Sequence, residues 1–215
     1  MNVYFNNRFL LAFILAILVP VDYVFAEIQH LFNRQGTQYT IPKGKFPKWD
    51  DMLKRWNKTQ GLVDNDCQSG LFNSCYLREL ETLIADIKKE PEWHKINEIN
   101  GFVNQMRYQE DIYVYGISDY WAIPHEFFDN EWGDCEDYSL TKYYALKALG
   151  LKSSDMQIAV VKDININVHH AILIVNYKDE HYVLDNRLSD VIKLKRLKHY
   201  QPVYTINEQY WWFYH

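Results

Sequence analysis

The residues that could do chemistry begin with Cys135, in the run Trp132-Gly133-Asp134-Cys135-Glu136-Asp137-Tyr138. A glycine turn there leads into a sequence typical of a helix, predicted over residues 139–149. This arrangement places the thiol at a helix N-terminus, where unpaired backbone N–H groups and the helix dipole favour the thiolate. Cys135 is therefore the candidate nucleophile.

Two later residues could complete a catalytic cysteine site. His170 follows Cys135 by 35 residues and Asp185 follows His170 by 15, each in an apolar run typical of a strand. An imidazole can take and return the thiol proton, and a carboxylate can hold the imidazole in one tautomer. In an antiparallel pair, any odd sum of paired residue numbers puts His170 and Asp185 on one face. A sum of 355 would set them directly opposite, with a turn centred on Tyr177-Lys178. The pattern predicts a Cys-His-Asp enzyme.

His169 is an alternative base, because it alternates with His170 along the same strand. A register slip of one residue would exchange the faces, so spacing alone does not choose between the two histidines. Taken singly, Cys135, His170 and Asp185 could also be a buried thiol, a strand-end histidine and a turn aspartate. Their order and spacing together favour catalysis.

Three acids adjoin the candidate nucleophile. Asp134, Glu136 and Asp137 place negative charge beside a thiol that must ionise, and like charge raises the thiol pKa. Acids are common in the first turn of a helix, which is the simplest reason for their presence. A hard cation such as Ca²⁺, bound by these carboxylates, would instead cancel the charge and order the turn.

The elements that must position these residues follow from the apolar spacing. Helical spacing precedes Cys135, and runs rich in Val, Ile and Tyr follow a helix that should end at Gly150. This order predicts an α+β fold, with N-terminal helices and an antiparallel sheet packed on the Cys135 helix. Residues 27–48 show no clear period and are expected to form an arm laid on the domain. The expected helices are 49–57, 77–88 and 93–108, the expected extended segment is 113–124, and the expected strands are 157–162, 170–177, 181–185, 192–197 and 200–213.

The first 26 residues have the layout of a secretory signal peptide. Met1–Arg8 is positively charged, Phe9–Val19 is an apolar run of eleven residues, and Val24-Phe25-Ala26 resembles a cleavage site. An uncleaved anchor is the alternative, although eleven residues fall short of the roughly 20 that span a bilayer. We expect residues 27–215 to form a single exported domain.

The composition of the chain bears on whether it binds nucleic acid and on whether its cysteines form a disulfide. The net charge of −5 and the absence of a long basic run argue against nucleic-acid binding. Export implies an oxidising compartment, yet the chain has three cysteines. A disulfide between Cys67 and Cys75 would leave Cys135 free; the alternative is that Cys67 and Cys75 are reduced and buried.

Several motifs together resemble the bacterial transglutaminase-like cysteine proteinases of the LapG type. The Gly-Asp-Cys-Glu-Asp-Tyr core is the most specific of them, and the resemblance covers about residues 45–213 in order. The matching runs are Trp121-Ala122-Ile123-Pro124-His125-Glu126, Gly133-Asp134-Cys135-Glu136-Asp137-Tyr138 with Lys142-Tyr143, His170-Ala171-Ile172-Leu173, Val183-Leu184-Asp185-Asn186, and Asn207-Glu208 with Trp211-Trp212.

The resemblance implies a fold and an activity. It implies a papain/transglutaminase-like core and a periplasmic, calcium-dependent endoprotease that cleaves the N-terminal region of a large surface adhesin at a di-alanine site, promoting biofilm dispersal. It also implies an inhibitory partner, the periplasmic domain of an inner-membrane cyclic-di-GMP receptor. The same fold carries transglutaminases and other acyltransferases, which remain an alternative, as does a binding protein without catalysis.

The resemblance also assigns roles to residues. It implies Cys135 as nucleophile, His170 as general base and Asp185 as orienting acid, and so favours His170 over His169. It implies Asp134 and Glu136 as Ca²⁺ ligands, with Asp137 as a third. The backbone N–H of Cys135 is the natural oxyanion donor, because it lies at the helix start.

Overall fold

The structure, a computed structural model, describes residues 28–32, 34–59, 61–63 and 75–215 of the 215-residue chain. The predicted signal peptide, residues 1–26, lies outside this part, as does Cys67. In the described ranges no helix has both the length and the apolar character needed to cross a membrane. The boundary between signal peptide and mature domain stays a prediction.

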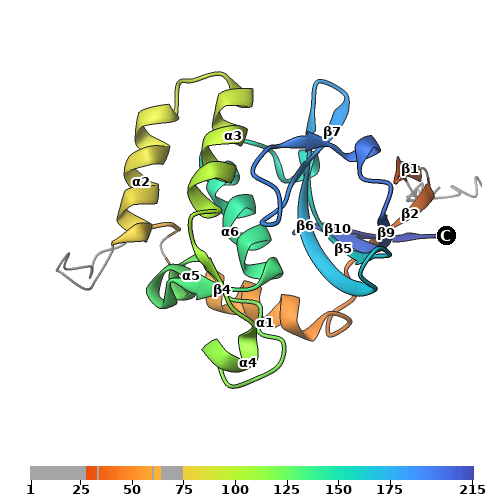
Figure 1. Cartoon of the computed structure of the whole chain (residues 1–215), viewed down its shortest axis with the longest axis horizontal. Coiled ribbons are helices and arrows are strands. Elements are labelled where there is room, and N and C mark those ends of the chain that lie inside the picture. Colours follow the sequence, from red (N-terminus) through yellow and green to blue (C-terminus); the bar gives the residue numbers. More distant parts are fainter. Residues whose placement is uncertain (1–27, 33, 60, 64–74) are drawn as a thin grey trace, which may run out of the picture.

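The described residues form a layer of helices packed against one large antiparallel sheet (Figure 1). Helix α6 lies between the other helices and the sheet and is buried along most of its length, so it is the centre of the packing. This arrangement confirms the predicted α+β order, with the Cys135 helix packed on the sheet. The helices are α1 (Pro47–Trp56), α2 (Tyr76–Ile87), α3 (Glu92–Val103), α4 (Asp111–Val114), α5 (Pro124–Asn130) and α6 (Cys135–Ala148).

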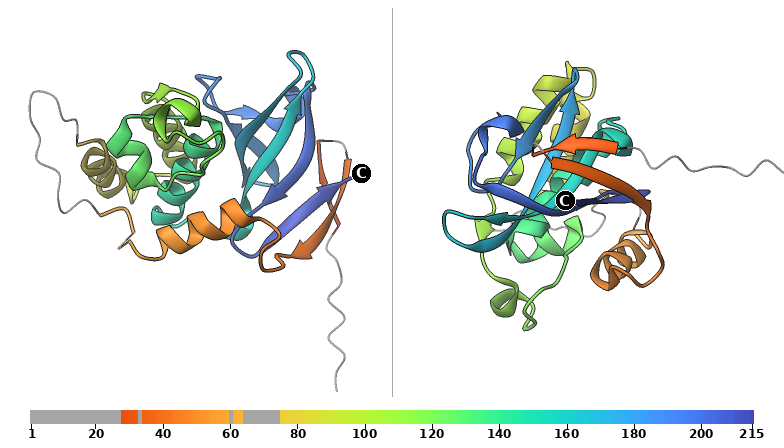
Figure 2. Two further views of the ribbon diagram at one scale, coloured as in Figure 1. Left: turned by 90° about the horizontal axis from the view of Figure 1, so that it is seen from below. Right: turned by 90° about the vertical axis from the view of Figure 1, so that its right-hand side faces the viewer.

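The sheet has eight strands in the order β1-β2-β10-β9-β5-β6-β7-β8. It curls strongly, as the two views of Figure 2 show, and a small hollow is lined both by Leu31 of β1 and by Leu194 beyond β8. One face packs on the helices, and the other encloses a second core. The strands are β1 (Ile28–Leu31), β2 (Arg34–Thr40), β5 (Met156–Asp163), β6 (Val168–Tyr177), β7 (Glu180–Leu184), β8 (Ile192–Lys193), β9 (Tyr200–Ile206) and β10 (Tyr210–Tyr214).

The N-terminal arm differs from the prediction. Ile28–Leu31 and Arg34–Thr40 are not laid over the domain but form the antiparallel pair β1–β2, and β2 pairs with β10, the last strand of the described residues. The sequence of β2 lacks a clear apolar alternation because its partner supplies the aromatic side chains. Gly36 is one example: a Cβ there would lie 2.6 Å from the ring of Tyr214.

Other segments also depart from the predicted spans. The third helix ends at Val103, and Arg107–Tyr108 forms a short strand, β3, parallel to β4 (Trp132–Gly133). Residues 113–124 are not wholly extended, because α4 includes their start and Pro124 begins α5. The predicted strand 192–197 is a strand only at 192–193, and its remainder is a 3₁₀ turn. Residues 200–213 form two strands rather than one.

Helix α6 begins and ends where local chemistry requires. Asp134 is the N-cap residue, and Asp137 accepts the Asp134 N–H in a capping box. Gly133 is required before the cap, since a Cβ there would lie 2.6 Å from both the Asp137 carboxylate and the ring of Phe127. After the helix, Gly150 has a φ of +95°, the left-handed conformation expected of a helix stop.

Candidate active site

Cys135 is the first residue of α6, and its thiol is free. Its Sγ donates a hydrogen bond to Oε2 of Glu136 at 3.1 Å. Burial raises the pKa of the thiol well above its usual value, and the charges of Glu136 and Asp134 raise it further. A hydrogen bond with the Ala171 backbone acts in the opposite direction. The predicted electrostatic penalty on the thiolate is therefore present in the structure.

His170 and Asp185 form a buried hydrogen-bonded pair. Nε2 of His170 lies 2.8 Å from Oδ1 of Asp185, and both side chains are excluded from solvent. Asp185 also accepts the hydroxyl of Tyr200 at 2.7 Å and the N–H of Arg187 at 2.9 Å. Burial alone would raise the pKa of Asp185, but the His170 interaction and these hydrogen bonds outweigh it and lower the pKa. Asp185 is thus held as a carboxylate that orients the imidazole.

The second nitrogen of the imidazole is available for chemistry. Nδ1 of His170 is buried and has no hydrogen-bond partner among the described residues. His170 and Cys135 line the same cleft, and Ala171, which contacts the thiol through its backbone, directly follows His170. The structure therefore brings all three residues of the predicted triad to one place.

The predicted register between β6 and β7 was wrong by two residues. Leu173 pairs with Leu184, so paired residue numbers sum to 357 and the turn is centred on Lys178-Asp179. Asp185, one residue beyond β7, is diagonal to His170 rather than directly opposite. Because 357 is also odd, both side chains keep the same face, which is why the pair still forms.

His169 also lines the cleft, but its surroundings differ from those of His170. It is exposed, whereas His170 is buried. Of the two histidines, only His170 has a hydrogen bond to a carboxylate among the described residues. The geometry therefore favours His170 as the base.

The cleft has a volume of about 530 Å³ and is open to solvent. Its walls come from the loop before α1, the segment before α5, the start of α6, and strands β5, β6 and β9. Trp121 forms part of one wall and is buried. A cleft of this size accommodates an extended polypeptide segment around Cys135.

The acids near Cys135 belong to a larger carboxylate cluster. Asp111 and Asp119, distant in sequence, join Asp134, Glu136 and Asp137 in groups whose ligand atoms lie within 4.8 Å of one another. Burial raises the pKa of Asp134 and of Glu136, and charge repulsion from Glu136 and Asp137, respectively, adds to it. Sequence reasoning missed Asp111 and Asp119, because no local pattern marks them.

The cluster has the chemistry of a hard-cation site. Oδ1 of Asp111 and Oδ1 of Asp134 are buried and have no hydrogen-bond partner among the described residues. Carboxylate oxygens are the ligands that Ca²⁺ prefers in proteins. The carboxylate of Asp137 already accepts two hydrogen bonds, from the N–H groups of Ala122 at 2.8 Å and of Asp134 at 3.3 Å. The residues present fit Ca²⁺.

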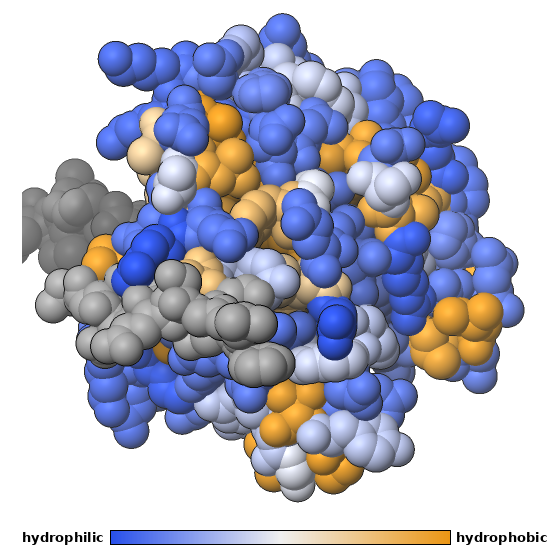
Figure 3. All heavy atoms as spheres, turned by 60° about the vertical axis from the view of Figure 1, so that its left-hand side comes forward, coloured by the Kyte–Doolittle hydropathy of each residue, from blue (hydrophilic) through white to orange (hydrophobic). Residues whose placement is uncertain are grey.

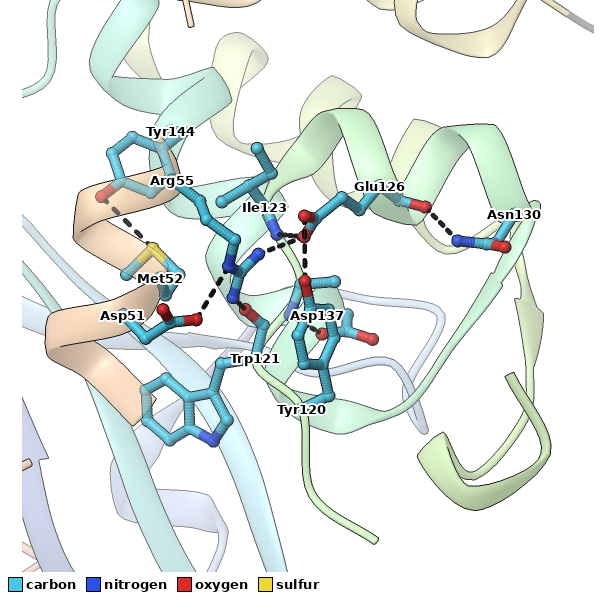
Figure 4. A network of polar contacts seen from close by, with 11 residues as sticks. Asp51, Met52, Arg55, Tyr120, Trp121, Ile123, Glu126, Asn130, Asp137 and Tyr144 are labelled. Atoms are coloured by element: carbon cyan, nitrogen blue, oxygen red, sulfur yellow. Dashed lines mark hydrogen bonds and ion pairs between the residues drawn. The ribbon is translucent and has the colours of Figure 1, made fainter. Parts of the chain in front are cut away.

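Arg55 of α1 fixes the backbone segment that holds Asp111 and Asp137; Figure 4 shows the contacts of Arg55 and the position of Asp137. Its guanidinium donates to the carbonyl of Trp121 at 2.7 Å and pairs with Glu126 and Asp51. The same segment donates the Tyr120 N–H to Asp111 and the Ala122 N–H to Asp137. Helix α1 therefore positions the carboxylate cluster as well as the cleft wall.

Lys142 is a buried cation that sequence reasoning did not assign to the site. It lies on α6, fully excluded from solvent, and its Nζ has no hydrogen-bond partner within the described ranges. Burial lowers the pKa of Lys142 to about 7, and the charge of Asp185 opposes that shift. Nζ of Lys142 lies 5.9 Å from the centre of the Tyr138 ring on the same helix.

The cysteines partly match the prediction. Cys75, at the start of α2, is disulfide-bonded, and Cys135 is free. The predicted partner, Cys67, lies outside the described residues.

Comparisons with known proteins give one family and one set of solved structures. The family model for bacterial transglutaminase-like cysteine proteinase (BTLCP) matches residues 67–212. The structure of Legionella pneumophila LapG is 28% identical, with a TM-score of 0.59 and coverage of 76% of this chain and 86% of that chain. Its calcium-bound form gives the same values, and its EGTA-treated form differs only in coverage, 84% of that chain. No curated protein sequence matched.

Proposed function

Because the chain belongs to the bacterial transglutaminase-like cysteine proteinases, a hydrolase family, we propose that Cys135, His170 and Asp185 form its catalytic triad. The family match and the similarity to LapG confirm the transglutaminase-like α+β core. The observation that supports the triad most directly is the 2.8 Å hydrogen bond between His170 and Asp185. This bond uses Nε2 of His170 and leaves Nδ1 available. His170 and Cys135 line the same cleft.

The proposed reaction is peptide hydrolysis through an acyl-enzyme. Nδ1 of His170 takes the thiol proton, and Sγ of Cys135 attacks the scissile carbonyl carbon. The imidazolium then protonates the leaving amine, and water, deprotonated by His170, hydrolyses the thioester. Asp185 keeps Nε2 protonated throughout. The backbone N–H of Cys135, unpaired within the helix because it lies in the first turn, is the proposed oxyanion donor.

We propose that the enzyme depends on Ca²⁺ held by Asp134 and Glu136, with Asp137 as the third predicted ligand. The structure adds Asp111 and Asp119 as further oxygen donors of the same cluster. Bound Ca²⁺ would offset the negative charge beside the thiol and so favour the thiolate. The existence of calcium-bound and EGTA-treated forms of LapG supports this assignment.

The proposed substrate is the N-terminal region of a large cell-surface adhesin, and the proposed location is the periplasm. Cleavage there would release the adhesin and promote biofilm dispersal. The resemblance of the motifs around Cys135 and the predicted signal peptide support this proposal. Hydrolysis is preferred to acyl transfer to an amine because the matched family is one of proteinases.

Purified protein is expected to cut an adhesin N-terminal fragment, and excess EGTA is expected to stop the cutting. Glu136→Ala should lower calcium affinity by about tenfold or more, as measured by calorimetry, because it removes a ligand. The matched control is Asp190→Ala, an exposed acid outside the cluster. New N-termini in mass spectra support a protease, whereas isopeptide crosslinks would indicate an acyltransferase. Full cutting in EGTA would contradict calcium dependence.

We propose further that the periplasmic domain of an inner-membrane cyclic-di-GMP receptor inhibits the enzyme by covering the cleft. Ile28–Leu31 and Arg34–Thr40 are strands, and none of the residues in these two strands lines the cleft, so the strands do not block the site. Tyr108, a half-exposed aromatic on the cleft rim, is the type of residue that anchors protein interfaces.

The receptor domain is expected to stop adhesin cleavage when added in excess. Tyr108→Ala should weaken its capture by about tenfold, the loss typical of an anchoring aromatic. Tyr113→Ala, which removes an aromatic of greater exposure that does not line the cleft, is the control. Capture without any loss of proteolysis would contradict inhibition by occlusion.

A further inference from the structure

A row of directly paired residues crosses the sheet from the catalytic cysteine to the distant strand β10. Ala171 pairs with Val160, Val160 with Tyr204, and Tyr204 with Phe213. Paired residues share a face, so all four side chains lie on the helix-facing side. The first three line the cleft, and Phe213 lies beyond it. The row leads across the sheet from the part of the cleft beside Cys135 to Phe213.

Aromatic rings in contact with one another lie along this row of paired residues. The ring of Phe46 lies 5.2 Å from that of Tyr204 and 5.3 Å from that of Trp211. Trp211 stacks on Tyr39 at 5.0 Å, with Phe213 beside it at 6.5 Å. In Figure 2, α1 runs from this part of the sheet toward the helical layer. These ring contacts therefore extend from the cleft to strands β10 and β2.

The far end of the row is an aromatic shelf, formed by the exposed rings of Tyr39 and Phe213 together with the buried ring of Trp211. Tyr39 is 46% exposed and Phe213 is 48% exposed, although both are large apolar side chains. They line a hollow of about 440 Å³, and Nζ of Lys45 lies 4.0 Å above the Trp211 ring. The surface seen from the helical side is, in contrast, mostly hydrophilic with separate apolar patches (Figure 3).

The occupant of the shelf follows from its connection to the cleft. Lys45, an exposed lysine, lines both hollows, so the cleft and the hollow at the shelf adjoin one another. A proteinase must hold its substrate extended, so that the nucleophile reaches a backbone carbonyl that is not buried in folded structure. The substrate polypeptide is therefore the occupant that fits a shelf adjoining the cleft.

We propose that the aromatic shelf binds a hydrophobic side chain of the substrate about four residues from the scissile bond. The distance follows from strand spacing: the row crosses three gaps of about 4.8 Å, or roughly 14 Å. An extended chain advances about 3.4 Å per residue, so about four residues span the row. The proposal rests on the proposed function and adds a specificity subsite to it.

The test combines substitutions in enzyme and substrate. In the adhesin fragment, residues two to eight on each side of the cut are replaced one at a time by Ala. With unmodified enzyme, replacing one apolar substrate residue, three to six residues from the cut, by Ala should lower kcat/KM by about tenfold. The loss should appear as a higher KM, because an aromatic contact to the substrate is removed. With Phe213→Ala or Tyr39→Ala, the same substitution should change kcat/KM by less than about twofold, because coupled sites are not additive.

Controls separate substrate binding at the shelf from effects on folding, on the chemical step or on dimer formation. Tyr113→Ala enzyme should keep the full tenfold effect, and all variants should keep their thermal midpoint and kcat. If the effects of the enzyme and substrate substitutions on kcat/KM simply multiplied, the proposed binding at the shelf would be wrong. It would also be wrong if no substrate position were sensitive to replacement by Ala. A dimer that Phe213→Ala converts to a monomer would show that a second copy occupies it. No cutting by unmodified enzyme would instead refute the proposed substrate.

Discussion

Replacing Cys135 by Ala is expected to lower proteolysis by roughly 10⁴-fold or more, because the proposed acyl-enzyme requires this sulfur. The thiol is the one free cysteine of the described residues, so no neighbouring sulfur replaces it. The measurement is the rate at which new N-termini appear from the adhesin fragment.

Two controls accompany the Cys135→Ala variant. Its thermal midpoint should match that of the unmodified protein, because removing one small side chain at the cleft leaves the core intact. Binding of the fragment to the variant should also persist, which would make the variant useful for trapping substrate. Retention of a tenth of the normal rate would rule out Cys135 as the nucleophile.

Replacing His170 by Ala is expected to lower the rate by about 10³-fold, because the base and its oriented nitrogen are lost together. The adjacent His169→Ala variant is the matched control, since both histidines line the cleft but differ in burial and partners. The loss for His169→Ala should be far smaller. Equal losses would mean that the cleft does not distinguish the two imidazoles, and the assignment of Asp185 as orienting acid would then be wrong.

The sequence predicted most of the elements because their apolar periods are strong. The helices at α1 and α2 and the strands β5, β6 and β7 lie within about two residues of their predicted spans. The choice of His170 over His169 came from the family resemblance, because parity alone does not decide between them; once the sum of paired residue numbers is odd, His170 and Asp185 share a face whatever the exact register. The exact register could not be predicted, since the turn Lys178-Asp179 has positive φ at both residues without the Asn-Gly type of sequence that signals it.

Features made by distant segments left no local signal. Asp111 and Asp119 reach the carboxylate cluster because the Arg55 network holds the segment of Tyr120 against α6, and neither acid belongs to a motif. Helix α5 has only seven residues, too few for a helical period to stand out. Strand β2 pairs with β10, and β10 supplies most of the aromatic side chains at this pairing, so the sequence of β1 and β2 resembles a polar arm.

The pairing of β2 with β10 has a consequence for how the chain can fold. It joins the first described strands to the last, so the sheet cannot be completed until Tyr210–Tyr214 is available. Such a non-local pairing is slow to form, because loop closure must precede the contacts that stabilise it. A nascent chain would therefore lack a finished sheet during synthesis. Because we propose that the protein is exported, we expect β2 and β10 to pair only after Tyr210–Tyr214 has followed the rest of the domain across the membrane.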